Sequence, residues 1–231
     1  MIFEVGNTII AFFSVKTIAF TFIGYPMSYI EFCGTLLYLW SVWLMAKSRI
    51  LTWPVGIVSV LLYLAIFYQI RLYSDAFEQI YYLAASAYGW WKWAQASRSD
   101  DEKSLPVTFS SSRIIVCAAC GTLVFSVVLG NFVSQLHILL PSLIPEKASY
   151  PYLDALTTVM SFTAMFLMAF KRTESWLYWI IVDVIGIWLY YVKEVKFIAL
   201  LYVILLVMAS NGLVMWIKES QKSAAPQNRS G

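Results

Sequence analysis

Seven apolar runs, each close to the length of a membrane-crossing helix, occupy most of this chain. A helix needs about 20 apolar residues to cross a bilayer. The runs cover residues 29–46, 53–70, 76–93, 113–132, 152–170, 175–192 and 197–217. Charged residues make up only 13% of the sequence, whereas soluble domains carry about a quarter. The runs therefore predict an all-α integral membrane protein with seven transmembrane helices.

An internal repeat organises these runs. When Tyr29 is placed on Tyr152, residues 29–93 align with residues 152–216 without a gap. The matched pairs include Glu31 with Asp154, Arg49 with Arg172, Trp53 with Trp176, Tyr68 with Tyr191, Gly89 with Gly212 and Trp93 with Trp216. Apolar segments share identities by chance, but charges, glycines and tryptophans rarely match in one register. We therefore expect two three-helix repeats joined by one linking span.

The repeat divides the chain into five parts. These are an apolar N-terminal segment (1–28), the first repeat (29–93), a loop with the linking span and an outer loop (94–151), the second repeat (152–217) and a polar tail (218–231). Residues 9–24 form an apolar run that is short for a membrane span, and Lys16 interrupts it. The run therefore predicts either an interfacial helix or a marginal extra span. The loops and the tail are too short to fold as a soluble catalytic domain.

The basic residues predict the orientation. Most Lys and Arg residues fall on the side of the membrane that also holds the C-terminus, against Arg71, Lys147, Lys193 and Lys196 on the other side. The positive-inside rule therefore places the C-terminus in the cytoplasm. A single linking span makes both repeats enter the membrane from the same side, which predicts a pseudo-twofold axis along the membrane normal. The natural place for a solute is the seam between the repeats, near the midplane.

Asp183 is a chargeable group in the middle of an apolar run. At about 100° per residue it shares one helical stripe with Trp176, Trp179, Gly186 and Tyr190. A chargeable group at membrane depth is costly and usually faces a cavity where it has a function. The alternative is a structural acid that bonds a neighbouring helix. We expect Trp176, Trp179 and Asp183 to bind a solute.

Other spans carry further candidates for the seam. The third span presents an amide and a phenol on one face, and the second and last spans add aromatic and amide groups. These candidates are Gln79, Tyr82, Trp53, Tyr63 and Asn211. Each could instead hold neighbouring helices together, as polar groups often do in membranes.

Acidic residues gather near the non-cytoplasmic ends of the spans. They are Glu31, Asp75, Glu78, Asp154 and Glu194. Such an entrance attracts cations and repels phosphates. The alternative is an ordinary interfacial belt of aromatic and scattered charged residues.

Enzymatic and metal chemistry have little support in the sequence. The one histidine, His137, falls in a loop, and Cys117 and Cys120 lie one helical turn apart without further metal ligands. A membrane enzyme needs a nucleophile with a base, or clustered histidines and acids. A retinal pigment needs a lysine at mid-depth, and the last span has none. We therefore expect no catalytic residue, no metal, no cofactor and no nucleic-acid partner.

Four motifs resemble those of the PnuC family of bacterial nicotinamide riboside transporters. They are residues 53–56 (Trp-Pro-Val-Gly), 72–76 (Leu-Tyr-Ser-Asp-Ala), 88–93 (Tyr-Gly-Trp-Trp-Lys-Trp) and the spacing Trp176-x-x-Trp179-x-x-x-Asp183. The resemblance spans residues 29–216. It assigns Trp176, Trp179 and Asp183 to the binding region.

This resemblance implies a 3+1+3 fold like that of the SWEET sugar transporters and a homotrimer in the bacterial inner membrane. It also implies import of nicotinamide riboside by facilitated diffusion, made one-way by phosphorylation in the cytoplasm. The alternative is a carrier of another neutral or cationic small solute, such as a sugar or thiamine, on the same fold.

Overall fold

The computed structural model describes residues 11–98, 105–139 and 149–224. A short hairpin comes first, with strands β1 (Ile18–Phe22) and β2 (Tyr25–Ser28). The helices within these ranges are α2 (Tyr29–Ala46), α3 (Thr52–Gln69), α4 (Tyr73–Arg98), α5 (Ser112–Leu139), α6 (Pro151–Ala169), α7 (Ser175–Val192) and α8 (Lys196–Ala224). Each predicted span forms a helix, although α4, α5 and α8 are longer than expected.

Six of these helices are long and apolar enough to cross a membrane. The remaining helix, α4, carries Asp75, Glu78 and Gln79 in its first turns, which lowers its hydropathy. It packs between α3 and α6, so neighbouring helices cover much of its surface. The chain is therefore an all-α membrane protein apart from its N-terminal hairpin.

The N-terminal segment differs from the expected helix. Residues 18–28 form the antiparallel pair β1 and β2, in which Phe22 faces Tyr25. Alternating aromatic and β-branched residues favour strands, and the turn passes through Ile23 and Gly24, which both have positive φ angles. The expected interfacial helix or extra span does not form over these residues. Residues 1–10 lie outside the described ranges.

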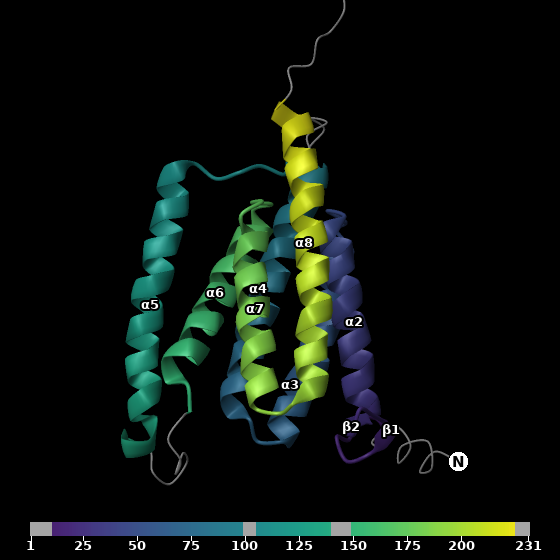
Figure 1. Cartoon of the computed structure of the whole chain (residues 1–231). Helices are drawn as coiled ribbons and strands as arrows, with labels where there is room; N and C mark the ends of the chain where they lie inside the picture. Colours follow the sequence, from purple (N-terminus) through teal and green to yellow (C-terminus); the bar gives the residue numbers. More distant parts are fainter. Residues whose placement is uncertain (1–10, 99–104, 140–148, 225–231) are drawn as a thin grey trace, which may run out of the picture.

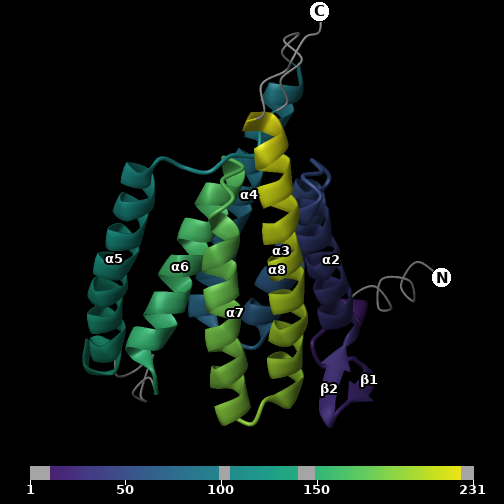
Figure 2. The same ribbon diagram turned by 45° about the horizontal axis from the view of Figure 1, so that its top comes forward.

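Six helices close into a ring. Along the ring, α2 packs on α3, α3 on α4, α4 on α6, α6 on α7, α7 on α8, and α8 back on α2 (Figures 1 and 2). Helix α5 packs mainly on α6 and stands at the edge of the bundle (Figure 1). We call the end that holds the C-terminus of α8 the basic end and the end that holds the hairpin the acidic end.

Two matching tryptophan and glycine contacts hold the ring together near its basic end. Trp53 of α3 lies against Gly89 of α4, and Trp176 of α7 lies against Gly212 of α8. A Cβ atom added at either glycine would meet three atoms of the indole ring within 2.7 Å. Both rings are only 1% exposed. Glycine is therefore required where each indole approaches the next helix.

A second pair of tryptophans bonds neighbouring helices of the ring. Trp93 packs edge-on against Trp53 at 5.3 Å, and its indole N–H donates to the Ala169 carbonyl at the end of α6. Trp216 packs edge-on against Trp176 at 5.6 Å. Its indole N–H donates to the carbonyl of Met45 near the end of α2. We call α2, α3 and α4 one group of three and α6, α7 and α8 the other. Each bond then joins the third helix of one group to the first helix of the other.

Replacing the contact glycines tests this packing. We expect Gly89→Ala and Gly212→Ala each to destabilise the protein by about 1–3 kcal/mol, because a buried indole ring would have to move. This corresponds to a fall in melting temperature of roughly 2–4 °C per kcal/mol. Thermal unfolding followed by tryptophan fluorescence measures the change.

Gly121→Ala on α5 is the matched control. A Cβ atom at Gly121 meets nothing within 4 Å, and alanine favours a helix over glycine. The control should therefore leave the melting temperature unchanged or raise it. Equal melting temperatures for all three variants and the parent would contradict the packing argument.

Candidate functional site

Polar side chains from all six ring helices face one another inside the ring. They are Tyr38 of α2, Tyr63 of α3, Tyr82 of α4, Ser161 of α6, Asp183 of α7 and Tyr202 of α8, and we call them the central cluster. Tyr82 hydrogen-bonds Ser161 and lies within electrostatic range of Tyr202. Tyr38 lies within the same range of Tyr63, Tyr82 and Asp183. The cluster therefore connects both groups of three helices.

Asp183 is the acid of this cluster, and its side chain is only 4% exposed. Tyr38 and Tyr202 are its electrostatic neighbours. Within the described part of the chain, no hydrogen bond or ion pair reaches its carboxyl group. A buried acid without a partner is costly. This favours a functional acid over a structural one.

Glycine also brings an aromatic ring close to Asp183. Gly186, one turn further along α7, lies against the ring of Tyr202, and a Cβ atom there would meet the ring within 2.9 Å. The same Tyr202 ring stacks on Tyr190 at 5.4 Å with an interplanar angle of 19°. Aromatic rings therefore pack close to Asp183 on α7 and α8.

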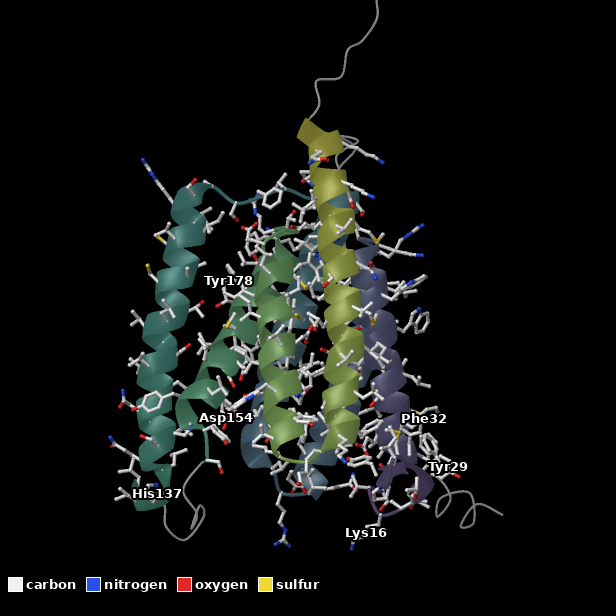
Figure 3. All side chains as sticks on the ribbon, viewed as in Figure 1. Lys16, Tyr29, Phe32, His137, Asp154 and Tyr178 are labelled. Carbon is white, nitrogen blue, oxygen red and sulfur yellow. The ribbon has the colours of Figure 1, made fainter. Side chains whose placement is uncertain are left out.

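The acidic end carries three carboxyl groups that influence one another. Glu78 accepts a hydrogen bond from Thr158 at 2.8 Å, which joins α4 to α6. Asp75 and Asp154 lie within electrostatic range of Glu78. Lys193 is a nearby cation and offsets part of this charge. Asp154 lies in the same half of the molecule as His137, the half that contains the acidic end (Figure 3).

The hairpin covers the acidic end between α2 and α8. The Tyr25 hydroxyl donates to Glu31 at 2.6 Å, and the Tyr25 ring stacks on Phe197 at 4.9 Å. Burial and the bond to Glu31 raise the pKa of the Tyr25 phenol above its ordinary value. The phenol therefore keeps its proton and remains a donor to Glu31 at all physiological pH values.

The sequence matches a known family over most of its length. Residues 28–218 fit the family model described as nicotinamide mononucleotide transporter. The chain belongs to this family.

Curated relatives and a solved structure agree with this membership. The nicotinamide riboside transporter PnuC of Escherichia coli is 32% identical over 86% of this chain and 89% of its own length. The riboflavin/roseoflavin transporter RibM of Streptomyces davaonensis is 26% identical over 90% of this chain and 93% of its own length. A crystal structure of the vitamin B3 transporter PnuC has a TM-score of 0.66 at 22% identity and covers 84% of this chain and 83% of its own. The protein is thus a multi-pass transporter rather than an enzyme.

Five of the eight residues predicted to bind a solute lie in or near the central cluster. Tyr63, Tyr82 and Asp183 belong to the central cluster, and Gln79 is half-buried about one turn from Tyr82. Trp179, also half-buried, lies between this cluster and the tryptophans of the basic end.

The remaining three predicted residues lie elsewhere. Trp53 and Trp176 are enclosed in the tryptophan packing of the basic end, so Gly89 and Gly212 cover part of their ring faces. Asn211 is exposed on α8. The inward face of α8 instead carries Tyr202 and the residues one and two turns beyond it, and Asn211 lies off this line.

Sequence reasoning missed Tyr38 and Ser161 as candidates and named Tyr202 only as the position that matches Gln79. The repeat itself held the signal, because Tyr38 and Ser161 occupy matching positions in the two repeats. Two polar residues at one repeat position, each inside an apolar run, are the pattern that could have identified both.

A large apolar groove lies outside the ring. It has a volume of about 680 Å³ and lies between α5, α6 and the outer side of α4. Its walls are almost entirely apolar, with Phe125, Phe162 and Phe166 among them. This surface suits lipid tails rather than a polar solute. No group of three metal ligands occurs in the described part of the chain.

Replacing Asp183 separates a functional acid from a structural one. We expect Asp183→Asn to raise the thermal stability of the empty protein by about 1–3 kcal/mol, because an amide is less costly to bury than an unpaired acid. The melting temperature without solute is the measurement.

Glu78→Gln is the matched control, since Glu78 has a partner in Thr158. This substitution should not raise the melting temperature. If Asp183→Asn instead destabilises the protein, Asp183 has a structural partner and the functional interpretation is wrong.

Proposed function

We propose that this protein imports nicotinamide riboside by facilitated diffusion through the central cluster. The observation that carries the proposal is Asp183, a buried acid without a described partner, surrounded by aromatic rings that come from both groups of three helices. The relative from Escherichia coli bears the name nicotinamide riboside transporter, which supports this choice of solute.

A flat cation suits this site. Nicotinamide riboside carries a fixed positive charge on its pyridinium ring. Aromatic faces attract such cations, with indole the best of them, by roughly 0.5–2 kcal/mol per contact. We propose that the ring stacks on Trp179 and that Asp183 supplies the opposite charge. Tyr82, Tyr63 and Gln79 would then bond the ribose hydroxyls and the carboxamide.

The charge of the site favours the riboside over its phosphate ester, although the family description names the mononucleotide. The central cluster has no Lys or Arg to replace the water around a phosphate, and Glu78, Asp75 and Asp154 stand at the acidic end. Desolvation of a phosphate there would be uncompensated. A flavin is the second candidate, because one relative is named for riboflavin transport.

We infer that the architecture is two parallel three-helix repeats joined by α5, in the 3+1+3 order. Matching positions support this: Trp53 and Trp176 meet Gly89 and Gly212 in the same way. The turns after the first helices place Ser48 and Lys171 at φ 53° and 50°, and those after the second helices place Arg71 and Glu194 at φ 62° and 60°. These are also matching positions. The central cluster then lies on the pseudo-twofold axis.

We propose that the basic end faces the cytoplasm of a bacterial cell, so that the C-terminus lies inside. Support comes from the distribution of charge and the positive-inside rule. Lys47, Lys92, Lys171 and Arg172 lie at this end, outside or at the limits of the spans. The acidic end would then be the entrance. By the family resemblance we also propose a homotrimer, and the exposed apolar face of α5, with Val124 and Phe125, suits contact with lipid or another copy.

Counterflow in proteoliposomes tests the solute and the mechanism together. We expect vesicles loaded with nicotinamide riboside to exchange it for labelled riboside without any ion gradient, because Asp183 is the one acid of the central cluster and no chain of acids crosses the ring. Unlabelled riboside should compete in this assay, whereas the mononucleotide, glucose and thiamine should not.

Stronger competition by riboflavin than by the riboside would favour the flavin candidate. Exchange that stops when proton and sodium gradients are dissipated would contradict facilitated diffusion.

Two substitutions test the proposed contacts. Asp183→Asn should weaken binding of the cationic riboside about tenfold, or ~1.4 kcal/mol, more than binding of its uncharged reduced form. Trp179→Leu should weaken the cation by a similar amount, because it removes the aromatic face and keeps apolar bulk. Isothermal titration with both ligands measures the difference.

Asn211→Leu is the control, since Asn211 is exposed away from the cluster. If the Asp183 and Trp179 variants bind both ligands as the parent does, the proposed contacts are wrong.

A further inference from the structure

A short segment between α4 and α5 closes the basic end of the ring. It comprises residues 105–111, and we call it the strap. Val107 of the strap is fully buried. It packs in a cluster that contains Met45, Ala46, Trp53, Trp93, Met168, Ala169, Trp176, Ala209 and Trp216. These residues come from all six ring helices, so Val107 occupies the point where the ring helices converge.

The strap is bonded to one side of the ring. Among the described residues its backbone pairs with the turn between α6 and α7: Thr108 N–H donates to the Lys171 carbonyl at 3.2 Å, and Thr173 N–H donates to the Thr108 carbonyl at 3.0 Å. Ser110 N–H donates to the Glu174 carboxylate at 3.1 Å and 3.2 Å. The Arg172 guanidinium also donates to the Thr108 hydroxyl. These bonds fix the strap to the group of α6, α7 and α8.

The strap meets the other side of the ring through apolar packing. Val107 shares its cluster with Trp53 and Trp93 of α3 and α4. The turn between α2 and α3 matches the anchoring turn in the repeat, but its described side-chain bond goes elsewhere, from Ser48 to Glu219 of α8 at 3.0 Å. The strap is hydrogen-bonded to the group of α6, α7 and α8 but only packed against α3 and α4. It can therefore separate from α3 and α4 while it keeps its hydrogen bonds to the α6–α7 turn.

Four buried polar groups in or near the strap have no hydrogen-bond partner among the described residues of the protein. They are the indole N–H groups of Trp53 and Trp176 and the hydroxyls of Ser110 and Ser175. Polar groups of this kind are costly to bury away from water. Access of water between the strap and the tryptophans would therefore favour these groups.

We propose that the strap is the gate at the basic end of the transport path, that Val107 is its seal, and that the gate moves with the α6–α7 turn. This rests on the proposed function for the direction of transport. The closed gate separates the central cluster from the solution at the basic end. A solute leaves the cluster when the two groups of three helices part and Val107 withdraws from Trp53 and Trp93.

Cysteine labelling without any solute tests the gate. In a background that lacks Cys33, Cys117 and Cys120, Val107→Cys reports on the seal. Ser86→Cys, buried about one turn beyond Tyr82 on α4, reports on the interior. A membrane-impermeant maleimide is added to inside-out and right-side-out vesicles. We expect Glu174→Ala, which removes the acceptor for Ser110 N–H, to speed labelling of both cysteines about tenfold from the side of the basic end.

Lys47→Ala is the control, because Lys47 is an exposed charged residue at the same end whose ammonium group lies over Trp43 of its own helix. It should leave both labelling rates unchanged. Phe109→Cys, on the exposed side of the strap, should be labelled quickly in every background. Leu105→Cys is a second reporter of the seal, should Val107→Cys fail to fold.

Equal labelling of Val107→Cys in the parent, Glu174→Ala and Lys47→Ala backgrounds would overturn the proposal. So would faster labelling at Val107→Cys without any change at Ser86→Cys, because the strap would then be a surface flap. Failure of riboside exchange in the parent would count against the proposed function alone, since the labelling needs no solute.

Discussion

The close approach of an indole ring to a glycine is the contact on which the rest of this structure depends. Trp53 against Gly89 and Trp176 against Gly212 bring the second and third helices of each group together at the basic end. This places Trp93 and Trp216 where their N–H groups reach carbonyls of α6 and α2, the neighbouring helices. The same contacts build the buried cluster that contains Val107. In a bilayer, where apolar burial between helices gains little over lipid, such tight packing is a main source of helix association.

Much of the fold could be predicted from the sequence because the bilayer imposes a simple rule on span length and apolar content. The seven helices and the family followed from runs and motifs. The hairpin could not be foreseen in the same way. An apolar segment such as residues 18–28 can bury its side chains as a strand pair or as a helix, and the choice depends on packing partners such as Phe32 and Phe197.

The site was harder to predict than the fold for a geometric reason. Helical periodicity groups Trp176, Trp179 and Asp183 on one stripe of α7. It does not say at which depth this stripe stops packing against the tryptophans of the basic end and begins to face the central cluster. The ring decides this, because α8 covers Trp176 through Gly212 and leaves Asp183 beside Tyr38 and Tyr202. Asn211 was chosen for its polarity alone, and periodicity on α8 relative to Tyr202 already placed it outside. The sequence of α7 alone therefore does not show which of its residues α8 covers.

The two groups of ring helices meet at two seams, α2–α8 and α4–α6, and the hairpin makes these seams mechanically unequal. At the α2–α8 seam, Tyr25 contacts both helices, through Glu31 on one side and Phe197 on the other. The α4–α6 seam has direct contacts instead, such as the Tyr81 hydroxyl to the Phe162 carbonyl at 2.8 Å. If the acidic end widens at the α4–α6 contact, the hydrogen bond from Thr158 to Glu78 must break. If it widens at the α2–α8 contact, Tyr25 must separate from Glu31 or from Phe197. Two nearly symmetric contacts are therefore closed by different kinds of interaction, one by a direct bond between helices and the other by a third element that lies between them.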